Sequence, residues 1–189
     1  MAHPKASAGH FHAVQFYKDD DSLISLVAKF LAEGFMLNQP GVIIATPEHR
    51  VAIEEGLESL HLDVTRMKQL GDLVVLDARE VLNIILADGM PHARLFTHVL
   101  GTTLQQVTRI HPNRTIRAYG EMVNVLWKDG QTAAAIRLET LWNELAKSYD
   151  FKLLCGYSMG NIYQDAAVGE ITRHHSHLLV DTGEAATIN

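Results

Sequence analysis

Short runs of consecutive apolar residues, each followed by a segment with apolar residues at helical spacing, constrain this fold more than any other sequence feature. Residues 42–45 (VIIA) and 73–76 (LVVL) contain no polar residue, which is typical of a strand buried on both faces. The alternation of such strands with helices predicts a parallel sheet with right-handed crossovers. We therefore expect a three-layer α/β fold with helices on both faces of the sheet.

The pattern places strands and helices along most of the chain. The predicted strands cover residues 11–17, 42–45, 72–77, 115–122 and 151–157. The predicted helices carry residues 23–31, 47–60, 78–86, 91–110 and a stripe from Leu138 to Leu145 after Gly130, and a last helix ends at about 174–177. Thr46 is expected to cap the second helix, with Pro47 at its first position. Residues 1–10 are predicted to be a mobile arm, residues 11–180 one domain, and residues 181–189 a flexible tail.

Charge and composition exclude several classes of protein. The chain has 189 residues, with 16 Lys and Arg against 22 Asp and Glu, a formal charge of −6. No basic stripe is present to neutralise phosphates, so direct nucleic-acid binding is not expected. The single cysteine, Cys155, cannot form an internal disulfide, and the sequence shows neither a secretion signal nor a run of about 20 apolar residues. We expect a cytoplasmic protein that does not enter a membrane.

The carboxyl ends of the predicted strands are the expected ligand edge, because open parallel sheets bind ligands there. Tyr17, Thr46, Arg79, Glu121 and Tyr157 fall at or just after those ends. A phosphate-binding loop would need glycines and a lysine after the first strand. Residues 19–21 are three aspartates instead, which are expected to cap the following helix and disfavour ATP hydrolysis.

Residues 117–122 (RAYGEM) bring charge into an otherwise apolar sheet. Strand alternation predicts that Arg117, Tyr119 and Glu121 share one face. Arg117 and Glu121 would lie about 13 Å apart, too far for a direct pair. Glu121 is therefore expected to meet Arg79 or Arg50, either in a structural ion pair or in contact with a ligand.

Four stretches of the chain resemble the methanogen/methylotroph, DcmR-like sensory (MEDS) domain family. They are residues 12–17 (HAVQFY), 117–123 (RAYGEMV) with Leu126, Trp127 and Gly130, 138–145 (LETLWNEL) and 153–157 (LLCGY). The resemblance, over about residues 10–180, implies a RecA/KaiC-like core without a working phosphate loop. It also implies a sensory role, with small hydrocarbon derivatives as proposed ligands and a histidine kinase or a regulator as the partner. By the same resemblance His12, Glu121, Glu139, Trp142 and Tyr157 are positions of interest.

The remaining polar candidates have plainer interpretations. Trp142 is expected in the core beside Glu139, whose carboxylate would pair with a strand arginine such as Arg117. His10 and His12, or His174 and His177, could each form a pair, but neither pair supplies the three or four ligands of a metal site. A solvated terminal histidine cluster is the preferred interpretation, so no metal and no cofactor is predicted. Cys155 is expected to be a small buried residue of the fifth strand.

We therefore expect a non-enzymatic sensory domain that binds a small ligand or a signalling partner and forms homo-oligomers. The predicted ligand residues are His12, Tyr17, Thr46, Arg79, Arg117, Tyr119, Glu121, Glu139, Trp142 and Tyr157. One alternative is a degenerate RecA/KaiC-like nucleotide-binding domain, in which Glu121 and Asp77 would hold a metal ion. A second alternative is an oligomerisation module that binds no small molecule.

Overall fold

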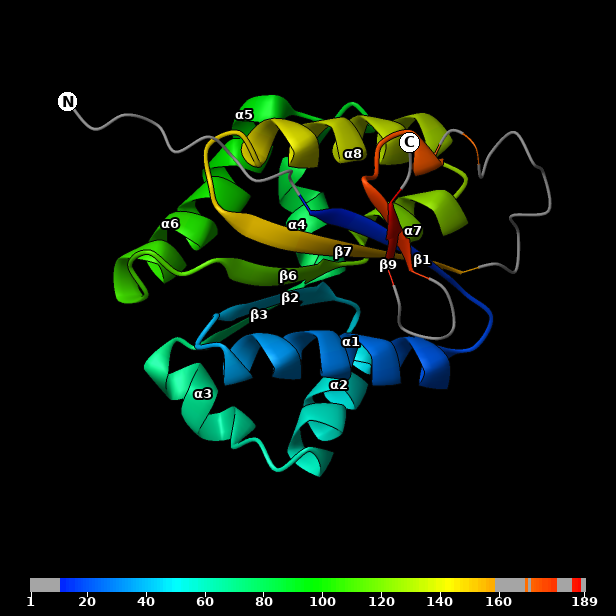
Figure 1. Ribbon diagram of the computed structural model, residues 1–189. Helices are drawn as coiled ribbons and strands as arrows, with labels where there is room; N and C mark the ends of the chain where they lie inside the picture. Colours follow the sequence, from blue (N-terminus) through cyan, green and yellow to red (C-terminus); the bar gives the residue numbers. More distant parts are fainter. Residues whose placement is uncertain (1–10, 159–168, 170, 180–184, 188–189) are drawn as a thin grey trace.

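The computed structural model describes residues 11–158, 169, 171–179 and 185–187 as a central sheet between two helical layers (Figure 1). This arrangement confirms the predicted three-layer α/β fold. The predicted arm at residues 1–10 lies outside the described residues.

The main sheet has seven strands in the order β3-β2-β6-β7-β1-β8-β9. All neighbouring strands pair in parallel except β9, which runs antiparallel to β8. The strands are β1 (His12–Tyr17), β2 (Gly41–Ala45), β3 (Leu73–Asp77), β6 (Ile116–Gly120), β7 (Phe151–Ser158), β8 (His177–Leu179) and β9 (Ala185–Thr187). A separate hairpin joins β4 (Leu86–Ala87) to β5 (Met90–Pro91).

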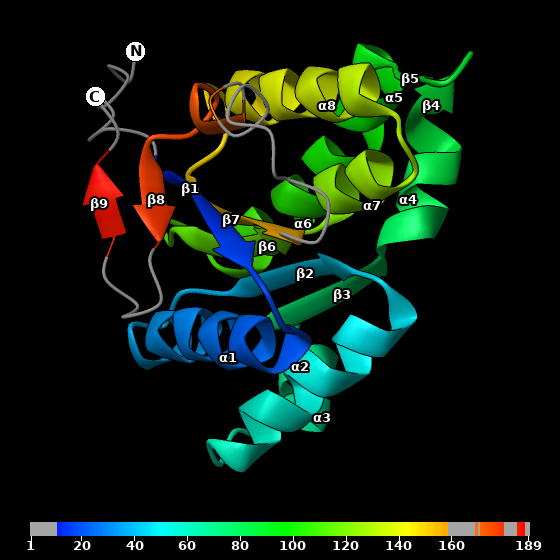
Figure 2. The ribbon, with the colours of Figure 1, turned by 90° about the vertical axis from the view of Figure 1, so that its right-hand side faces the viewer.

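Helices cover both faces of the sheet, in two groups that follow chain order (Figures 1 and 2). One face carries α1 (Asp20–Met36), α2 (Pro47–Ser59) and α3 (Val64–Leu70). The other face carries α4 (Ala78–Ile85), α5 (Ala93–Phe96), the π-helical turn η1 (Thr97–Gly101), α6 (Thr102–Ile110), α7 (Met122–Lys128) and α8 (Thr132–Leu145). Each face therefore has its own apolar core.

Several predicted boundaries were wrong. The strand predicted to end at residue 122 stops at Gly120, because the chain turns into α7 directly after Glu121. The short helix α3 was not predicted, and the helix predicted over 91–110 is interrupted by η1. The Thr46 side chain makes no capping hydrogen bond, although α2 does begin at Pro47.

The chain after residue 170 also differs from the prediction. His177 begins β8 instead of ending a helix, and β9 lies inside the predicted flexible tail. Both strands have only three residues, too few to show a periodic pattern. They are held by backbone pairing, β8 to β1 and β9 to β8, which a local sequence pattern does not reveal.

Arg117 fixes α1 against the sheet. Its Nη1 donates to the carbonyl oxygen of Phe30 at 2.9 Å, and its Nε donates to Gln39 Oε1 at 2.9 Å. The guanidinium also lies over the Phe30 ring, 4.8 Å from the centroid. Tyr119 packs on the same face, as predicted from strand alternation. Gly34 allows this close approach, because a Cβ there would lie 2.6 Å from Arg117 Cγ.

No helix among the described residues is both long and apolar enough to cross a lipid bilayer.

We predict that Gly34→Ala destabilises the protein. The new methyl group would displace the Arg117 side chain, whose Nε and Nη1 are both hydrogen-bonded. Overpacking of this kind costs about 1–3 kcal/mol. Urea unfolding followed by circular dichroism measures the change. Gly101→Ala is the matched control, because its Cβ would meet only ordinary contacts at 3.5 Å and beyond. Equal stability of Gly34→Ala and the wild type would contradict the proposed role of Gly34.

Candidate functional site

The predicted site residues do not form one site. Tyr17, Thr46, Tyr119 and Glu121 gather at the carboxyl edge of the sheet, where Thr46 and Tyr119 hydrogen-bond to Glu121 and Tyr17 is close enough to feel its charge. His12, Glu139 and Tyr157 come together under α8, on the opposite face. Arg117 contacts α1, Trp142 packs in the core, and Arg79 lies at the surface. The predicted residues therefore belong to two separate polar centres, with Arg117, Trp142 and Arg79 outside both.

Glu121 is the centre of the carboxyl-edge network, which we call the Glu121 centre (Tyr17, Thr46, His49, Tyr119 and Glu121). Its buried carboxylate accepts a hydrogen bond from His49 Nδ1 at 2.6 Å, from Tyr119 Oη at 3.1 Å, and from the Thr46 backbone N–H. β2 pairs with β6, so the first turn of α2 begins beside the end of β6 and brings Thr46 and His49 to the carboxylate.

The prediction that Glu121 pairs with Arg79 or Arg50 was wrong. Arg50 binds Asp77 at 2.9 Å, and Arg79 binds Asp129 at 3.2 Å. Both arginines are in the first turns of helices that begin at the same edge, but each is closer to another carboxylate. His49 was missed because a single histidine in a helix carries no pattern that would connect it to a distant glutamate.

His49 links the buried carboxylate to the protein surface. Its Nε2 lies 3.4 Å from Oδ1 of Asp20, an exposed residue in the first turn of α1. The hydrogen bond to Glu121 raises the pKa of His49 above its ordinary value, although burial acts in the opposite direction. Burial also disfavours the Glu121 carboxylate, but His49 and the Thr46 N–H outweigh it and lower the pKa of Glu121. The pair is thus stabilised in its charged form.

Tyr17 joins the ends of three elements. Its hydroxyl oxygen accepts a hydrogen bond from Asn124 Nδ2 at 3.0 Å, and Asn124 Oδ1 accepts from the Ser158 N–H at 3.0 Å. Burial, and then the charge of Glu121, raise the pKa of Tyr17 well above its ordinary value. The tyrosine is therefore a neutral structural link between β1, α7 and β7 at neutral pH.

Asp77 and Glu121 each have partners of their own in this structure. Asp77 Oδ1 accepts from the N–H groups of Arg79 and Glu80 as the cap of α4, while Oδ2 binds Arg50. The predicted metal-holding role of these two carboxylates in a nucleotide site would require both sets of contacts to break. The aspartates after β1 act as expected, since Asp19 caps α1 by accepting from the Ser22 N–H.

A second polar centre is buried between β1, β7 and α8; we call it the His12 cluster (His12, Glu139, Cys155 and His175). His12 Nε2 lies 3.2 Å from Glu139 Oε2 and 3.4 Å from Cys155 Sγ. His175 Nε2 lies 3.4 Å from Glu139 Oε1, and Tyr157 Oη donates to the same oxygen at 2.7 Å. All four members of the cluster are of residue types that bind metal ions.

His12 contradicts the prediction of a solvated terminal histidine cluster, whereas His174 and His177 are partly exposed and His10 lies outside the described residues. His12 is 1% exposed and His175 is 6% exposed, and their rings lie 4.1 Å apart. Glu139 pairs with them instead of Arg117, which lies on the other face of the sheet. β8 pairs with β1, so the segment that precedes β8 returns to the start of the first strand. His175 was missed as a site residue because only this pairing brings it to His12.

Burial and charge set the protonation of the cluster. Burial lowers the pKa of His175 to about 4, so its ring is neutral at pH 7. Burial alone would raise the pKa of Glu139, but the His175 and His12 rings and the Tyr157 hydroxyl outweigh it and lower the pKa to about 2. Burial raises the pKa of the Cys155 thiol well above its usual range. Cys155 is thus a buried residue of β7, as predicted, yet it faces polar groups.

Trp142 takes no part in either polar centre. Its ring packs edge-to-face on Phe96, at a centroid distance of 5.1 Å, and on Phe151, at 5.9 Å. This agrees with the expectation of a core tryptophan.

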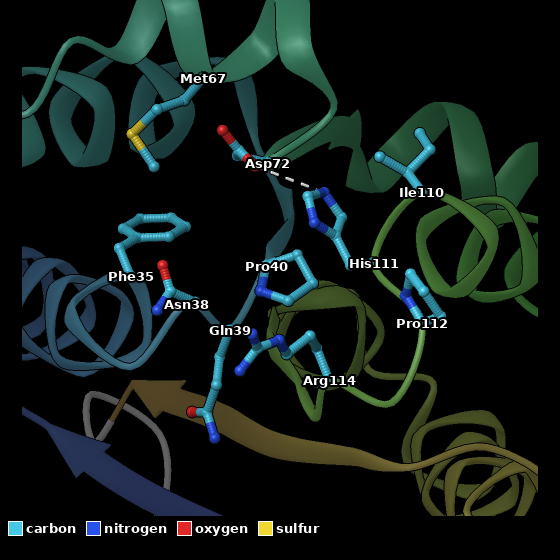
Figure 3. A pocket seen from close by; sticks show the side chains of 10 residues that line it. All are labelled: Phe35, Asn38, Gln39, Pro40, Met67, Asp72, Ile110, His111, Pro112 and Arg114. Carbon is cyan, nitrogen blue, oxygen red and sulfur yellow. Dashed lines mark ion pairs between the residues drawn. The ribbon is translucent and has the colours of Figure 1, made fainter.

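A cavity of about 530 Å³ opens at the amino edge of β2, β3 and β6, opposite the predicted ligand edge (Figure 3). Its walls combine apolar and polar side chains from α1, α3, α6 and the loops that precede the strands. They are Phe35, Asn38, Gln39, Pro40, Met67, Asp72, Ile110, His111, Pro112 and Arg114. His111 Nε2 lies 3.3 Å from Asp72 Oδ1 on one wall. This cavity was not predicted, because no sequence motif connects the loops that form it.

The chain is similar to one protein family in sequence and to a solved structure in fold. The family model described as MEDS, the MEthanogen/methylotroph, DcmR Sensory domain, matches residues 11–176. No curated protein matches the chain. The crystal structure of uncharacterized protein PH0321 from Pyrococcus horikoshii, in complex with an unknown peptide, is similar with a TM-score of 0.60 at 12% identity. The similarity covers 95% of this chain and 84% of that one, and shows the shared α/β fold.

We predict that His49→Gln lowers stability most at about pH 5–6. The pKa of His49 is higher in the folded protein than its unfolded value of 6.5. Protonated His49 therefore stabilises the fold fully below pH 6.5, and this contribution is lost as the pH rises through the folded pKa. The pKa of Glu121 is lower in the folded protein than its unfolded value of 4.5. The Glu121 carboxylate therefore stabilises the fold above pH 4.5, and this contribution is lost as the pH falls through the folded pKa. Both contributions are present between these two values.

Loss of the charged hydrogen bond should cost roughly 1.5–3 kcal/mol. Urea unfolding across pH 4–8 measures the difference from the wild type. His98→Gln, at an exposed position, is the control and should change stability little at any pH. A difference for His49→Gln that does not vary with pH would contradict the charged pair.

Proposed function

The chain belongs to the family of MEthanogen/methylotroph, DcmR Sensory (MEDS) domains, and from this we propose that it is a non-enzymatic sensory domain that binds a small organic ligand. It reports ligand occupancy to a separate signalling protein, a histidine kinase or a transcriptional regulator. The family match over residues 11–176 is the observation that carries this proposal.

We take the core to be of the RecA/KaiC type with its nucleotide function lost. The parallel sheet with helices on both faces is compatible with such a core. A phosphate at the N-terminus of α1 would meet Asp19, Asp20 and Asp21 where a nucleotide-binding loop offers glycine N–H groups and a lysine. This charge disfavours the nucleotide-binding alternative.

The cavity at the amino edge is the proposed ligand pocket. Phe35, Met67 and Ile110 offer apolar surface to the body of a small organic molecule, whereas Arg114 and Asn38 offer donors to a polar end. A pocket of this size, in which apolar side chains alternate with convergent polar groups, can hold a small molecule and orient it. A short-chain carboxylate fits this chemistry best, because Arg114 supplies a cation that binds carboxylates in a bidentate manner.

Gln39 connects the pocket to the body of the protein. It lines the cavity and accepts a hydrogen bond from Arg117, which in turn holds the Phe30 carbonyl of α1. A ligand that moves Gln39 changes the support of Arg117 and hence the contact between α1 and β6. Since α1 covers one face of the sheet, its displacement is a signal that a partner protein can detect.

The test is an NMR titration of the labelled protein with acetate and butyrate and with the alcohols, aldehydes and amines of the same carbon skeletons. We expect saturable shifts of the Asn38, Asp72 and His111 amides, strongest with a carboxylate. Arg114→Ala should weaken carboxylate binding by about tenfold or more, as loss of a charged hydrogen bond implies. Arg94→Ala, another exposed arginine, should not.

Gln39→Ala tests the connection to α1. We expect the variant to keep the ligand-induced shifts of the pocket residues and to lose those of Phe30 and Arg117. If no member of the panel binds while the protein self-associates, the sensory proposal fails and the oligomerisation module replaces it. A thermal shift with ATP and Mg²⁺ would instead favour the nucleotide-binding alternative.

A further inference from the structure

The His12 cluster brings four potential metal ligands to one point from distant parts of the sequence. His12 comes from β1, Cys155 from β7, Glu139 from α8, and His175 from the segment before β8. One donor atom from each lies within 4.8 Å of all the others, and all four residues are buried. None of them lines the amino-edge cavity, so the cluster is independent of the proposed ligand pocket.

The outer ring nitrogens of both histidines are already engaged. His175 Nδ1 lies 2.8 Å from the Ile171 carbonyl oxygen, which can only accept, so Nδ1 carries the proton. His12 Nδ1 lies 2.9 Å from Asn143 Oδ1, and Asn143 Nδ2 donates to the His174 carbonyl oxygen at 2.9 Å, which fixes the orientation of the amide. In the neutral rings both Nε2 lone pairs therefore face the centre of the cluster. Metal-binding histidines are held by a second set of residues in the same way.

The groups at the centre are mostly hydrogen-bond acceptors. The Nε2 of His12 faces a carboxylate oxygen at 3.2 Å and the sulfur at 3.4 Å, and the Nε2 of His175 faces the other carboxylate oxygen at 3.4 Å. His175 Nε2 is buried and has no hydrogen-bond partner among the described residues. A single proton can form a hydrogen bond between only one pair of these atoms. A cation at the centre can bind His12, Glu139, Cys155 and His175 at the same time.

The distances fit a tetrahedral ion. Zinc bonds of about 2.0–2.3 Å to nitrogen, oxygen and sulfur give a tetrahedron with edges of about 3.3–3.8 Å. His12 Nε2, Cys155 Sγ and Glu139 Oε2 form one face with edges of 3.2 Å, 3.4 Å and 3.9 Å. His175 Nε2 lies 3.4 Å from the other carboxylate oxygen, Oε1, and one donor atom from each of the four residues lies within 4.8 Å of all the others. Two imidazoles, one thiolate and one carboxylate are a ligand set that selects zinc over magnesium or calcium, which prefer oxygen.

We propose that His12, Glu139, Cys155 and His175 form a closed structural zinc site. Zinc binding converts the Cys155 thiol to a thiolate and releases one proton to solvent. Four protein ligands fill a tetrahedron and leave no position for a reactive water, so the site supports structure and not catalysis. The ion ties the segment before β8 to the first strand and to α8. Because the ligands are buried, zinc enters during folding or when this segment opens.

Cobalt substitution of the full-length, tag-free, reduced protein tests the site. Since Cys155 is the sole cysteine, a thiolate-to-cobalt charge-transfer band can arise only from this cluster. We expect one equivalent of Co²⁺ to produce that band together with the strong visible bands of a tetrahedral ion. One equivalent of Zn²⁺ should displace the cobalt, and metal analysis after dialysis should give one zinc per chain.

Variants separate the metal site from a hydrogen-bond network. Cys155→Ser should abolish the charge-transfer band, and Asn143→Ala should weaken zinc binding by about 10- to 100-fold through loss of ring orientation. His174→Gln is the matched control and should bind as the wild type does, since Asn143 donates to the His174 backbone carbonyl, which the substitution keeps. Circular dichroism shows which variants remain folded.

The wild-type titration decides the question even if every variant unfolds. Absence of the charge-transfer band in folded wild-type protein, or metal bound at well below one equivalent, would overturn the proposal. The four residues would then form a proton-sharing network only.

Discussion

A sheet buried on both faces imposes the constraint on which the rest of this structure depends. Six parallel strands lie between two helical layers, so polar side chains in the middle of the sheet have no access to water. Burial of an unpartnered carboxylate costs several kcal/mol, so each of them must find internal partners. Glu121 and Glu139, both 1% exposed, meet this requirement in different ways on the two faces of the sheet.

The two glutamates differ in how they connect to the surface. Glu121 binds His49, whose other ring nitrogen lies beside the exposed carboxylate of Asp20, so a single imidazole connects the buried carboxylate to the surface. Glu139 instead contacts three buried side chains, those of His12, His175 and Tyr157. The first centre is thus connected to the surface, whereas the second is the buried cluster for which we propose a zinc ion.

Sequence patterns predicted those parts of the fold that depend on local apolar periodicity. The five long strands and the helices α1, α2, α4 and α8 were predicted because each buries a regular stripe or run. The end of β6 was not predicted correctly. The Glu121 N–H still donates to the Ile44 carbonyl oxygen of β2, but the backbone dihedral angles of Glu121 are no longer those of a strand. The partners of Glu121 and Glu139 were also missed, because a histidine at position 49 or 175 gives no local sign of the carboxylate it will meet.

The sequence by itself determined the layered α/β class, the aspartates in place of a phosphate loop, and the segments that identify the family, because these depend on residues close together in the chain. Only the tertiary structure decided that His12 and His175 share one buried centre with Cys155 and Glu139, and that a cavity opens at the amino edge. The order of the strands in the sheet is the physical reason. β8 pairs with β1, and β6 lies between β2 and β7, so these pairings bring together segments that are far apart in sequence. Chemistry that needs several side chains at one point is therefore set by sheet topology and not by spacing along the chain.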